Sequence, residues 1–306
     1  MAKQNRVFGK VAKTLHKMKP NLVDATNIPL ELRILKYKRQ LHKKPYESTS
    51  WSDRSVYKDF CAVAAKHDDI FTMFKSYRSY REILENVPME TGRDCLQIIR
   101  SEGKEFLKYF DKFMQNDGVG NPVRYRYDIG KASPTTLRYV KVLVDLVNRF
   151  GSLDGLHIVE IGGGYGGQCK IISDVYQFKS YTIFDLEEVL QLTEKYLARM
   201  QLDNVFYKAL HDAEPSDSYD LIISNCAFSE CRKSIQDEYI DRVLLNSKRG
   251  YMTCNFDRET EDPNKPYDKK YLVKRMSERH DPVILEEVPK TGYMNFIMVW
   301  DDTIKK

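Results

Sequence analysis

The chain of 306 residues lacks a long apolar run and is poor in cysteine, histidine and tryptophan. No stretch approaches the roughly 20 apolar residues that a membrane-crossing helix needs, so the sequence predicts no membrane span. The six cysteines include no C-x-x-C pair, and Cys226 and Cys231 have no pair of histidines nearby, which argues against structural zinc and indicates reduced thiols. The first residues are too polar for a secretory signal peptide. We therefore expect a cytoplasmic protein, although the basic start of the chain leaves an organelle transit peptide open.

Acidic residues are scarce at the start of the chain. Residues 1–44 contain twelve lysines or arginines and two acidic residues, within a chain of net charge +5. A solvated helix face or a tail is the simplest interpretation. The segment could also meet nucleic acid, anionic lipid or a phosphorylated substrate, or support a homo-oligomer.

Glycine is sparse except at one place. Residues 156–170 read L-H-I-V-E-I-G-G-G-Y-G-G-Q-C-K, with five glycines in six positions. An acid precedes them in the spacing E-x-G-x-G-x-G, formed by Glu160, Gly162, Gly164 and Gly166. A buried strand that stops at glycines and restarts as a helix makes a tight turn where a ligand can touch the backbone.

The acid before this turn discriminates between two classes of ligand. Gly162, Gly164 and Gly167 also fit the G-x-G-x-x-G spacing of dinucleotide sites, whose pyrophosphate lies at a helix start. The carboxylate of Glu160 would repel a pyrophosphate but could hold an ammonium group. S-adenosylmethionine (SAM) carries an amine, a carboxylate and a sulfonium, and no phosphate, so SAM is the predicted cofactor. A second acid, Asp185, ends the next predicted strand and suits ribose hydroxyls, although it is also a favoured helix N-cap.

From residue 156 onward, short apolar runs alternate with segments of helical periodicity. This alternation predicts an α/β fold with a parallel sheet and helices on both faces. The last two runs are separated only by residues 289–293, so they should form an antiparallel hairpin at the sheet edge. The expected strands are 156–161, 180–185, 204–208, 219–225, 248–255, 282–288 and 293–300. The expected helices are 167–177, 187–200, 232–246 and 267–278.

The first part of the chain has a different pattern. Residues 1–117 read as a helical region for acceptor binding or oligomerisation, and residues 118–306 as the catalytic domain. Within the first region, apolar spacing predicts helices over 52–66, 68–86 and 93–115. The turn cluster N-D-G-V-G-N-P follows, and Ser133 with Pro134 should then cap a helix that reaches Phe150.

Several motifs together resemble known methyltransferases. Seven predicted strands, a terminal hairpin and E-x-G-x-G-x-G on the first strand resemble class I SAM-dependent methyltransferases. Five motifs between residues 133 and 300 resemble more closely the sugar O-methyltransferases found in gene sets for surface polysaccharides. These motifs are S-P-T-T-L-R-Y, V-E-I-G-G-G-Y-G-G, F-D-L-E-E-V, S-N-C-A-F-S-E and N-F-I-M-V-W. The resemblance implies a Rossmann-like seven-stranded sheet with one antiparallel strand, and SAM at the carboxyl ends of the central strands. The predicted cofactor-binding residues are Glu160, Gly162, Gly163, Gly164, Tyr165, Gly166, Asp185, Leu186, Asp212 and Asn225.

Methyl transfer to a sugar hydroxyl needs a base near the methyl group. Glu230, in the loop after the fourth strand, is the first candidate, although an acid there could instead stabilise the next helix through its dipole. His211, after the third strand, is the second candidate because histidine titrates near neutrality. Its neighbour Asp212 could accept from the adenine amine. No set of residues demands a metal, and a divalent ion near Glu230 stays open.

Acceptor-binding residues are expected around the same edge. Arg138 and Tyr139, on the helix before the glycines, could face the acceptor or the methionine carboxylate, and Asn255 ends the fifth strand. The resemblance adds Gln236 and Tyr239. Cys226 replaces the aromatic residue that is usual in the family motif, which affects the shape of the acceptor pocket rather than the chemistry.

The leading hypothesis is a SAM-dependent O-methyltransferase that acts on a sugar hydroxyl of a nucleotide sugar or glycan. Two alternatives stay open. One is a methyltransferase that acts on RNA or another small molecule, although the chain has no RNA-binding signature and nucleic acid is therefore the less favoured partner. The other is a protein that binds SAM without catalysis, because fold alone does not dictate activity.

Overall fold

The computed structural model describes residues 30–41, 55–214 and 218–303. The chain divides into two compact units, residues 1–41 and 42–306. In the first unit the described part contains one helix, α2 (Leu30–Lys38). The remainder of the predicted basic segment lies outside the described residues.

The second unit is built on a seven-stranded sheet in the order β5-β4-β3-β6-β7-β9-β8. All neighbouring strands are parallel except that β9 runs antiparallel to both β7 and β8. This confirms the predicted fold class, including the hairpin at the edge. The strands are β3 (His157–Ile161), β4 (Ser180–Phe184), β5 (Val205–Lys208), β6 (Leu221–Asn225), β7 (Arg249–Cys254), β8 (Val283–Glu286) and β9 (Phe296–Asp301).

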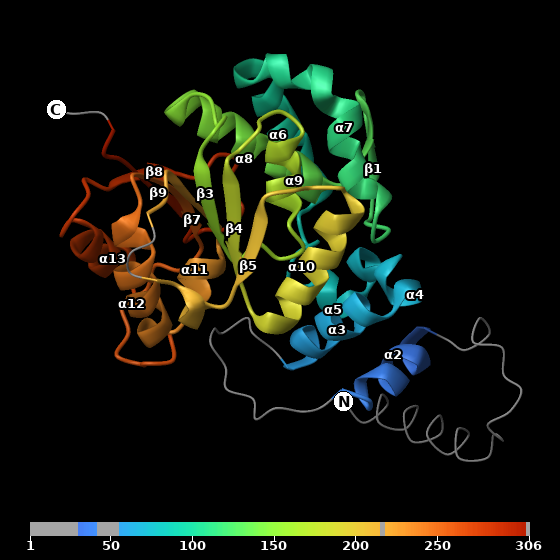
Figure 1. Cartoon of the computed structure of the whole chain (residues 1–306). Coiled ribbons are helices and arrows are strands. Elements are labelled where there is room, and N and C mark those ends of the chain that lie inside the picture. The colour runs from blue at the N-terminus through green and yellow to red at the C-terminus, as the bar shows by residue number, and fades with distance from the viewer. Residues whose placement is uncertain (1–29, 42–54, 215–217, 304–306) are drawn as a thin grey trace, which may run out of the picture. The chain divides into compact units, whose positions relative to one another are not determined.

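Helices cover both faces of this sheet, as Figure 1 shows. On one side lie α8 (Pro134–Phe150), α9 (Gly167–Ser173) and α10 (Glu187–Arg199). On the other side lie α12 (Lys233–Arg242) and α13 (Lys269–Met276), whose apolar residues share a buried cluster with β3, β6, β7 and β9. The short helix α11 (Ala227–Glu230) follows β6 directly.

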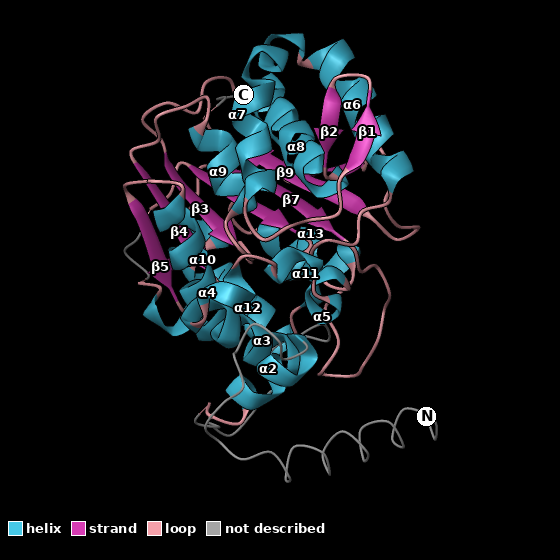
Figure 2. Cartoon of the chain, turned by 90° about the vertical axis from the view of Figure 1, so that its right-hand side faces the viewer, coloured by secondary structure: helices cyan, strands magenta, loops and turns pink. Residues whose placement is uncertain are grey.

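The helical region before the sheet packs against the sheet's own helices. Helix α3 (Ser55–Lys66) lies on α10, and α6 (Met89–Glu102) lies on α8. A small hairpin, β1 (Tyr125–Tyr127) with β2 (Gly130–Ala132), was not predicted and lies beside α6 in Figure 2. The domain boundary near residue 117 stays a prediction.

Two of the predicted amino-terminal helices are interrupted, which corrects the sequence-based expectation. The segment 68–86 contains α4 (Asp68–Phe71), a 3-10 turn and α5 (Arg78–Arg81), because Tyr77 is extended at φ −71° and ψ 135°. The segment 93–115 contains the end of α6, a 3-10 helix and α7 (Phe110–Met114).

The start of α8 forms as predicted. The Ser133 hydroxyl accepts a hydrogen bond from the Thr136 amide at 3.1 Å, and Pro134 occupies the first turn. The Asp117 carboxylate accepts from both the amide and the hydroxyl of Ser133, at 2.6 and 2.7 Å. These bonds attach the predicted turn cluster to the helix that precedes the sheet.

None of the helices in the described ranges is long and apolar enough to cross a membrane.

Candidate cofactor and acceptor site

The glycine loop connects β3 to α9 with three residues in the left-handed region. Gly162, Gly164 and Gly166 have φ values of 75°, 56° and 89°. The Gly162 amide donates to the Phe184 carbonyl at 2.7 Å. The Gly164 amide donates to the Asp185 carboxylate at 3.0 Å, so the acid that ends β4 is bonded directly to the loop.

Close packing explains why these positions carry glycine. A Cβ placed on Gly162 would lie 1.9 Å from the Cβ of Ala227, and one on Gly163 would lie 2.6 Å from Ile183. A Cβ on Gly164 would lie 2.9 Å from the side chain of Leu84. Each of these neighbours is protein, so the glycines alone do not indicate a ligand. A bound ligand would be recognised by the polar groups around the loop instead.

Glu160 is the most unusual of those groups. Its side chain is buried, with 2% of the residue exposed, and the Tyr181 hydroxyl donates to it at 2.8 Å. Burial raises the pKa of Glu160 to about 8, against the lowering effect of the Tyr181 hydroxyl. Asn225, at the end of β6, also lowers this pKa, yet neither atom of its buried amide has hydrogen-bond geometry with a described residue. The unpaired amide oxygen of Asn225 beside the buried carboxyl group of Glu160 fits a ligand that carries an ammonium group.

The residues predicted to contact ribose and adenine follow β4 and β5, on the β5 side of the central strand β3. Asp185 is half-buried and accepts from the Leu186 amide at 2.8 Å as well as from the loop. Asp212 accepts from the Ala209 amide at 3.1 Å and lies 3.3 Å from the His211 ring. The side chain of His211 is 71% exposed.

Tyr165 and Tyr139 are enclosed by protein. Tyr165 is fully buried, its hydroxyl accepts from Asn116 at 3.0 Å, and the Lys75 ammonium lies 3.9 Å from its ring centre. The Tyr139 ring packs edge-on against Tyr165, with ring centres 6.1 Å apart. Within the described residues, both rings therefore help to hold the glycine loop against the amino-terminal helices.

The first candidate base is held at the carboxyl ends of β6 and β7. The Glu230 carboxylate accepts from the Asn255 side-chain amide at 2.6 Å, and Asn255 is bonded to Ser229 through both its backbone and its side chain. Cys226 begins this loop with φ of 73°, a strained value for a residue other than glycine. His211 follows β5, three strands away from β6, or roughly 14 Å at normal strand spacing. The two candidate bases therefore cannot act on the same proton.

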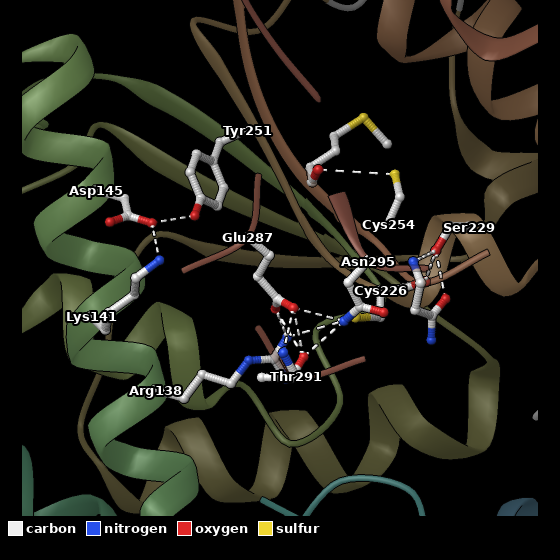
Figure 3. A network of polar contacts seen from close by, with 12 residues as sticks. Arg138, Lys141, Asp145, Cys226, Ser229, Tyr251, Cys254, Glu287, Thr291 and Asn295 are labelled. Carbon is white, nitrogen blue, oxygen red and sulfur yellow. Dashed lines mark hydrogen bonds and ion pairs between the residues drawn. The ribbon is translucent and has the colours of Figure 1, made fainter. Parts of the chain in front are cut away.

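A second polar group at this edge was not predicted from the sequence. Glu287 follows β8, and its carboxylate accepts from the amide and hydroxyl of Thr291 and from the Asn295 amide, at 2.8 to 2.9 Å (Figure 3). The Arg138 guanidinium lies 3.6 Å from the Cys226 sulfur and 4.0 Å from Glu287. Burial acts to lower the pKa of Arg138, but Cys226 and Glu287 outweigh it and raise the pKa, so Arg138 stays charged. A small pocket here is lined by Arg138, Lys141, Tyr251, Thr253, Glu287 and Thr291 among others. The available signal in the sequence was the position of Glu287 and Thr291 at the connection between the last two strands, β8 and β9.

The two acceptor residues implied by the resemblance have protein partners. Gln236 is fully buried, donates to the Phe228 carbonyl at 3.0 Å and accepts from the Tyr267 amide at 2.7 Å. Tyr239 is 6% exposed and packs edge-on against Phe184 and Phe228. Both residues shape the α11 loop, which carries Glu230.

Among the described residues, no three His, Cys, Asp or Glu side chains gather as a metal ion would require.

Comparison with known proteins gives low-identity structural neighbours. No family model and no curated protein matches the sequence. One similar solved structure is an rRNA methylase from Streptococcus thermophilus, at 14% identity and TM-score 0.39, over 54% of this chain and 96% of that one. A second is the CurJ carbon methyltransferase, at 13% identity and TM-score 0.41, over 68% and 70%. A third is the methyltransferase domain of bacterial CtHen1, at 14% identity and TM-score 0.40, over 54% and 97%.

Proposed function

We propose that this protein is a SAM-dependent O-methyltransferase whose acceptor is a sugar hydroxyl, on a nucleotide sugar or a glycan. The observation that carries the cofactor assignment is the buried carboxylate of Glu160 at the end of the central strand, beside the unsatisfied amide of Asn225. An ammonium group could donate to the Glu160 carboxyl group and to the Asn225 Oδ1 atom, and its charge would favour the ionised form of Glu160. Asp185, bonded to the loop on the adjacent strand, is suited to ribose hydroxyls.

The chain's own residues would then align the acceptor and take its proton. SAM, when bound, would supply a methyl group on a sulfonium sulfur. The acceptor oxygen would attack the methyl carbon in line as the carbon–sulfur bond breaks, and S-adenosylhomocysteine would leave. As the new oxygen–carbon bond forms, the hydroxyl proton passes to the carboxylate of Glu230. The hydrogen bond from the Asn255 side-chain amide fixes the direction of that carboxylate.

The sugar assignment is supported by the acceptor loop and its surroundings. The S-N-C-A-F-S-E segment that carries Glu230 resembles the sugar O-methyltransferases. Arg138, Glu287 and Thr291 offer charged and hydroxyl groups beside it, which suit an acceptor with several hydroxyls.

The test is transfer of a labelled methyl group. Calorimetry first measures SAM binding to the purified chain. The protein is then incubated with labelled SAM and a panel of nucleotide sugars and oligosaccharides, and the product mass is measured. Methylation of a panel member supports the proposal. SAM binding with transfer only to RNA, together with an RNA gel shift at physiological salt, would replace the sugar by RNA.

A further inference from the structure

Residues 79–85, which span α5 and the turn after it, contain an unusual group of unsatisfied polar atoms. The hydroxyls of Ser79 and Tyr80 and one carboxylate oxygen of Glu85 are buried and have no hydrogen-bond partner in the described structure. An unpaired buried polar group is unfavourable because it has given up its hydrogen bonds to water without replacing them. Three of them within seven residues require an explanation, because proteins rarely leave such groups unpaired.

This segment lies against the glycine loop. The side chain of Leu84 is the nearest neighbour of Gly164, at 2.9 Å from the position of a Cβ there. The ring of Phe74, just before the segment, packs on Tyr165 with ring centres 5.8 Å apart. On the other flank of the loop, Ala227 contacts Gly162, and the unsatisfied amide of Asn225 lies two residues earlier. The loop is thus flanked on both sides by unsatisfied polar groups.

The chemistry of these groups matches the cofactor rather than the acceptor. Burial raises the pKa of Tyr80 well above its usual value, and weaker effects of neighbours that include Glu85 and Asp185 add to it, so the hydroxyl stays a donor. Burial raises the pKa of Glu85 to about 7, while Lys75 and the hydroxyls of Thr135 and Tyr165 oppose the shift. A ligand with a positive charge would favour the ionised form of Glu85.

We propose that residues 79–85 form the outer wall of the cofactor site, where the Tyr80 hydroxyl binds a polar oxygen of SAM and the Glu85 carboxylate faces its positive charge. This inference rests on the proposed function. It gives the helical region before the sheet a direct part in holding the cofactor. It also requires residues 79–85 to move aside when SAM enters, because Leu84 contacts the loop.

Two conservative variants test this wall, with calorimetric Kd values for SAM and S-adenosylhomocysteine and thermal midpoints as readouts. In Tyr80→Phe only an unpaired hydroxyl is lost, so the ligand-free midpoint should not fall, while the Kd values for both ligands should rise about fivefold. In Glu85→Gln the Kd for SAM should rise about tenfold and that for S-adenosylhomocysteine less, since the latter lacks the sulfonium charge.

Tyr127→Phe is the matched control. Tyr127 is also buried, but its hydroxyl donates to the Met89 carbonyl at 3.2 Å, away from the glycine loop. This variant should lose stability and keep the wild-type Kd for SAM. If wild-type protein binds SAM and both Tyr80→Phe and Glu85→Gln bind it within twofold of wild type, the proposed wall is overturned and the proposed function stands. If wild-type protein does not bind SAM at all, the proposed function itself fails.

Discussion

Glu160 and Glu230 both lie near the carboxyl ends of central strands, but their surroundings favour different chemistry. Glu230 is partly exposed and accepts a hydrogen bond from the Asn255 amide, an environment that suits an ionised carboxylate acting as a general base. Glu160 is buried beside apolar strands, an environment that opposes its charge until a positive ligand arrives.

Replacing Glu230 by glutamine should remove the base and keep the geometry. We expect kcat to fall about 100- to 10,000-fold, the usual contribution of a positioned base, with an unchanged Kd for SAM. The measurement is steady-state turnover on the acceptor found by product mass, together with calorimetry. His211→Gln is the matched comparison, and a larger loss of kcat there than in Glu230→Gln would transfer the role of base to His211.

Replacing Glu160 by glutamine should stabilise the ligand-free protein at high pH. The folded pKa of about 8 lies above the ordinary value of 4.5, so the folded state binds more protons between these values. The free energy of unfolding therefore falls as the pH rises from about 4.5 to about 8. Glu160→Gln should raise the thermal midpoint at pH 9 by several degrees relative to wild type, and change it little at pH 5.

The same variant should bind SAM at least about tenfold more weakly, because the charge that holds the ammonium group is gone. The Tyr181 hydroxyl keeps an acceptor in the new amide oxygen, so the packing is conserved. A midpoint at pH 9 equal to or below that of wild type would contradict the assigned environment of Glu160.

At the scale of elements, the turn from β3 into α9 combines a backbone requirement with a packing requirement. Gly162 has positive φ and also has Ala227 in the space of a side chain. Gly155 has φ of 70° but open space around it. Gly118 has open space and no positive φ. Substitutions at these three glycines therefore separate the cost of a left-handed backbone from the cost of overpacking.

An alanine series at these positions should give graded losses in the free energy of unfolding. Gly118→Ala should change it by less than about 0.5 kcal/mol. Gly155→Ala should cost about 1–2 kcal/mol for the left-handed backbone. Gly162→Ala should cost about 3 kcal/mol or more, since overpacking adds to the same backbone cost. Denaturant unfolding measures the series, and equal losses at Gly155 and Gly162 would show that Ala227 moves away freely.

Elements of the sheet could be predicted from the sequence, and the helices before it only in part. Apolar runs bounded by turn residues placed every strand of the sheet within about three residues, because buried parallel strands read as continuous apolar segments. The end of α6 at Gly103, inside the predicted helix 93–115, could have been predicted because glycine often ends a helix. The break at Tyr77 had no such signal, because its extended conformation follows from the packing of neighbouring rings, such as Phe60 stacked on it at 4.4 Å.

At the scale of the whole molecule, the candidate site depends on contacts that cross the predicted boundary at residue 117. Asn116 donates to Thr136 of α8 and to Tyr165 of the glycine loop, and accepts from Tyr196 of α10. The Lys75 ammonium donates to the Asn116 carbonyl at 2.6 Å. Glu160 and Asp185 were predictable from a motif along the chain. Residues 79–85 were not, because an unsatisfied atom becomes visible only when distant segments are packed together.

These contacts predict that residues 118–306 do not form a stable domain alone. Removing residues 1–117 would delete Asn116, Asp117 and Lys75, and would expose the apolar faces of α8 and α10 to water. Buried polar networks of this kind are costly when half of their members are lost. A fragment of residues 42–306 keeps all of the second unit and is the matched control. We expect 42–306 to unfold cooperatively and to bind SAM, and 118–306 to lack a cooperative thermal transition and to be cleaved rapidly by protease. A fragment 118–306 with the thermal midpoint of the longer one would mean that the helices before the sheet are an accessory, and that cofactor binding depends on the sheet alone.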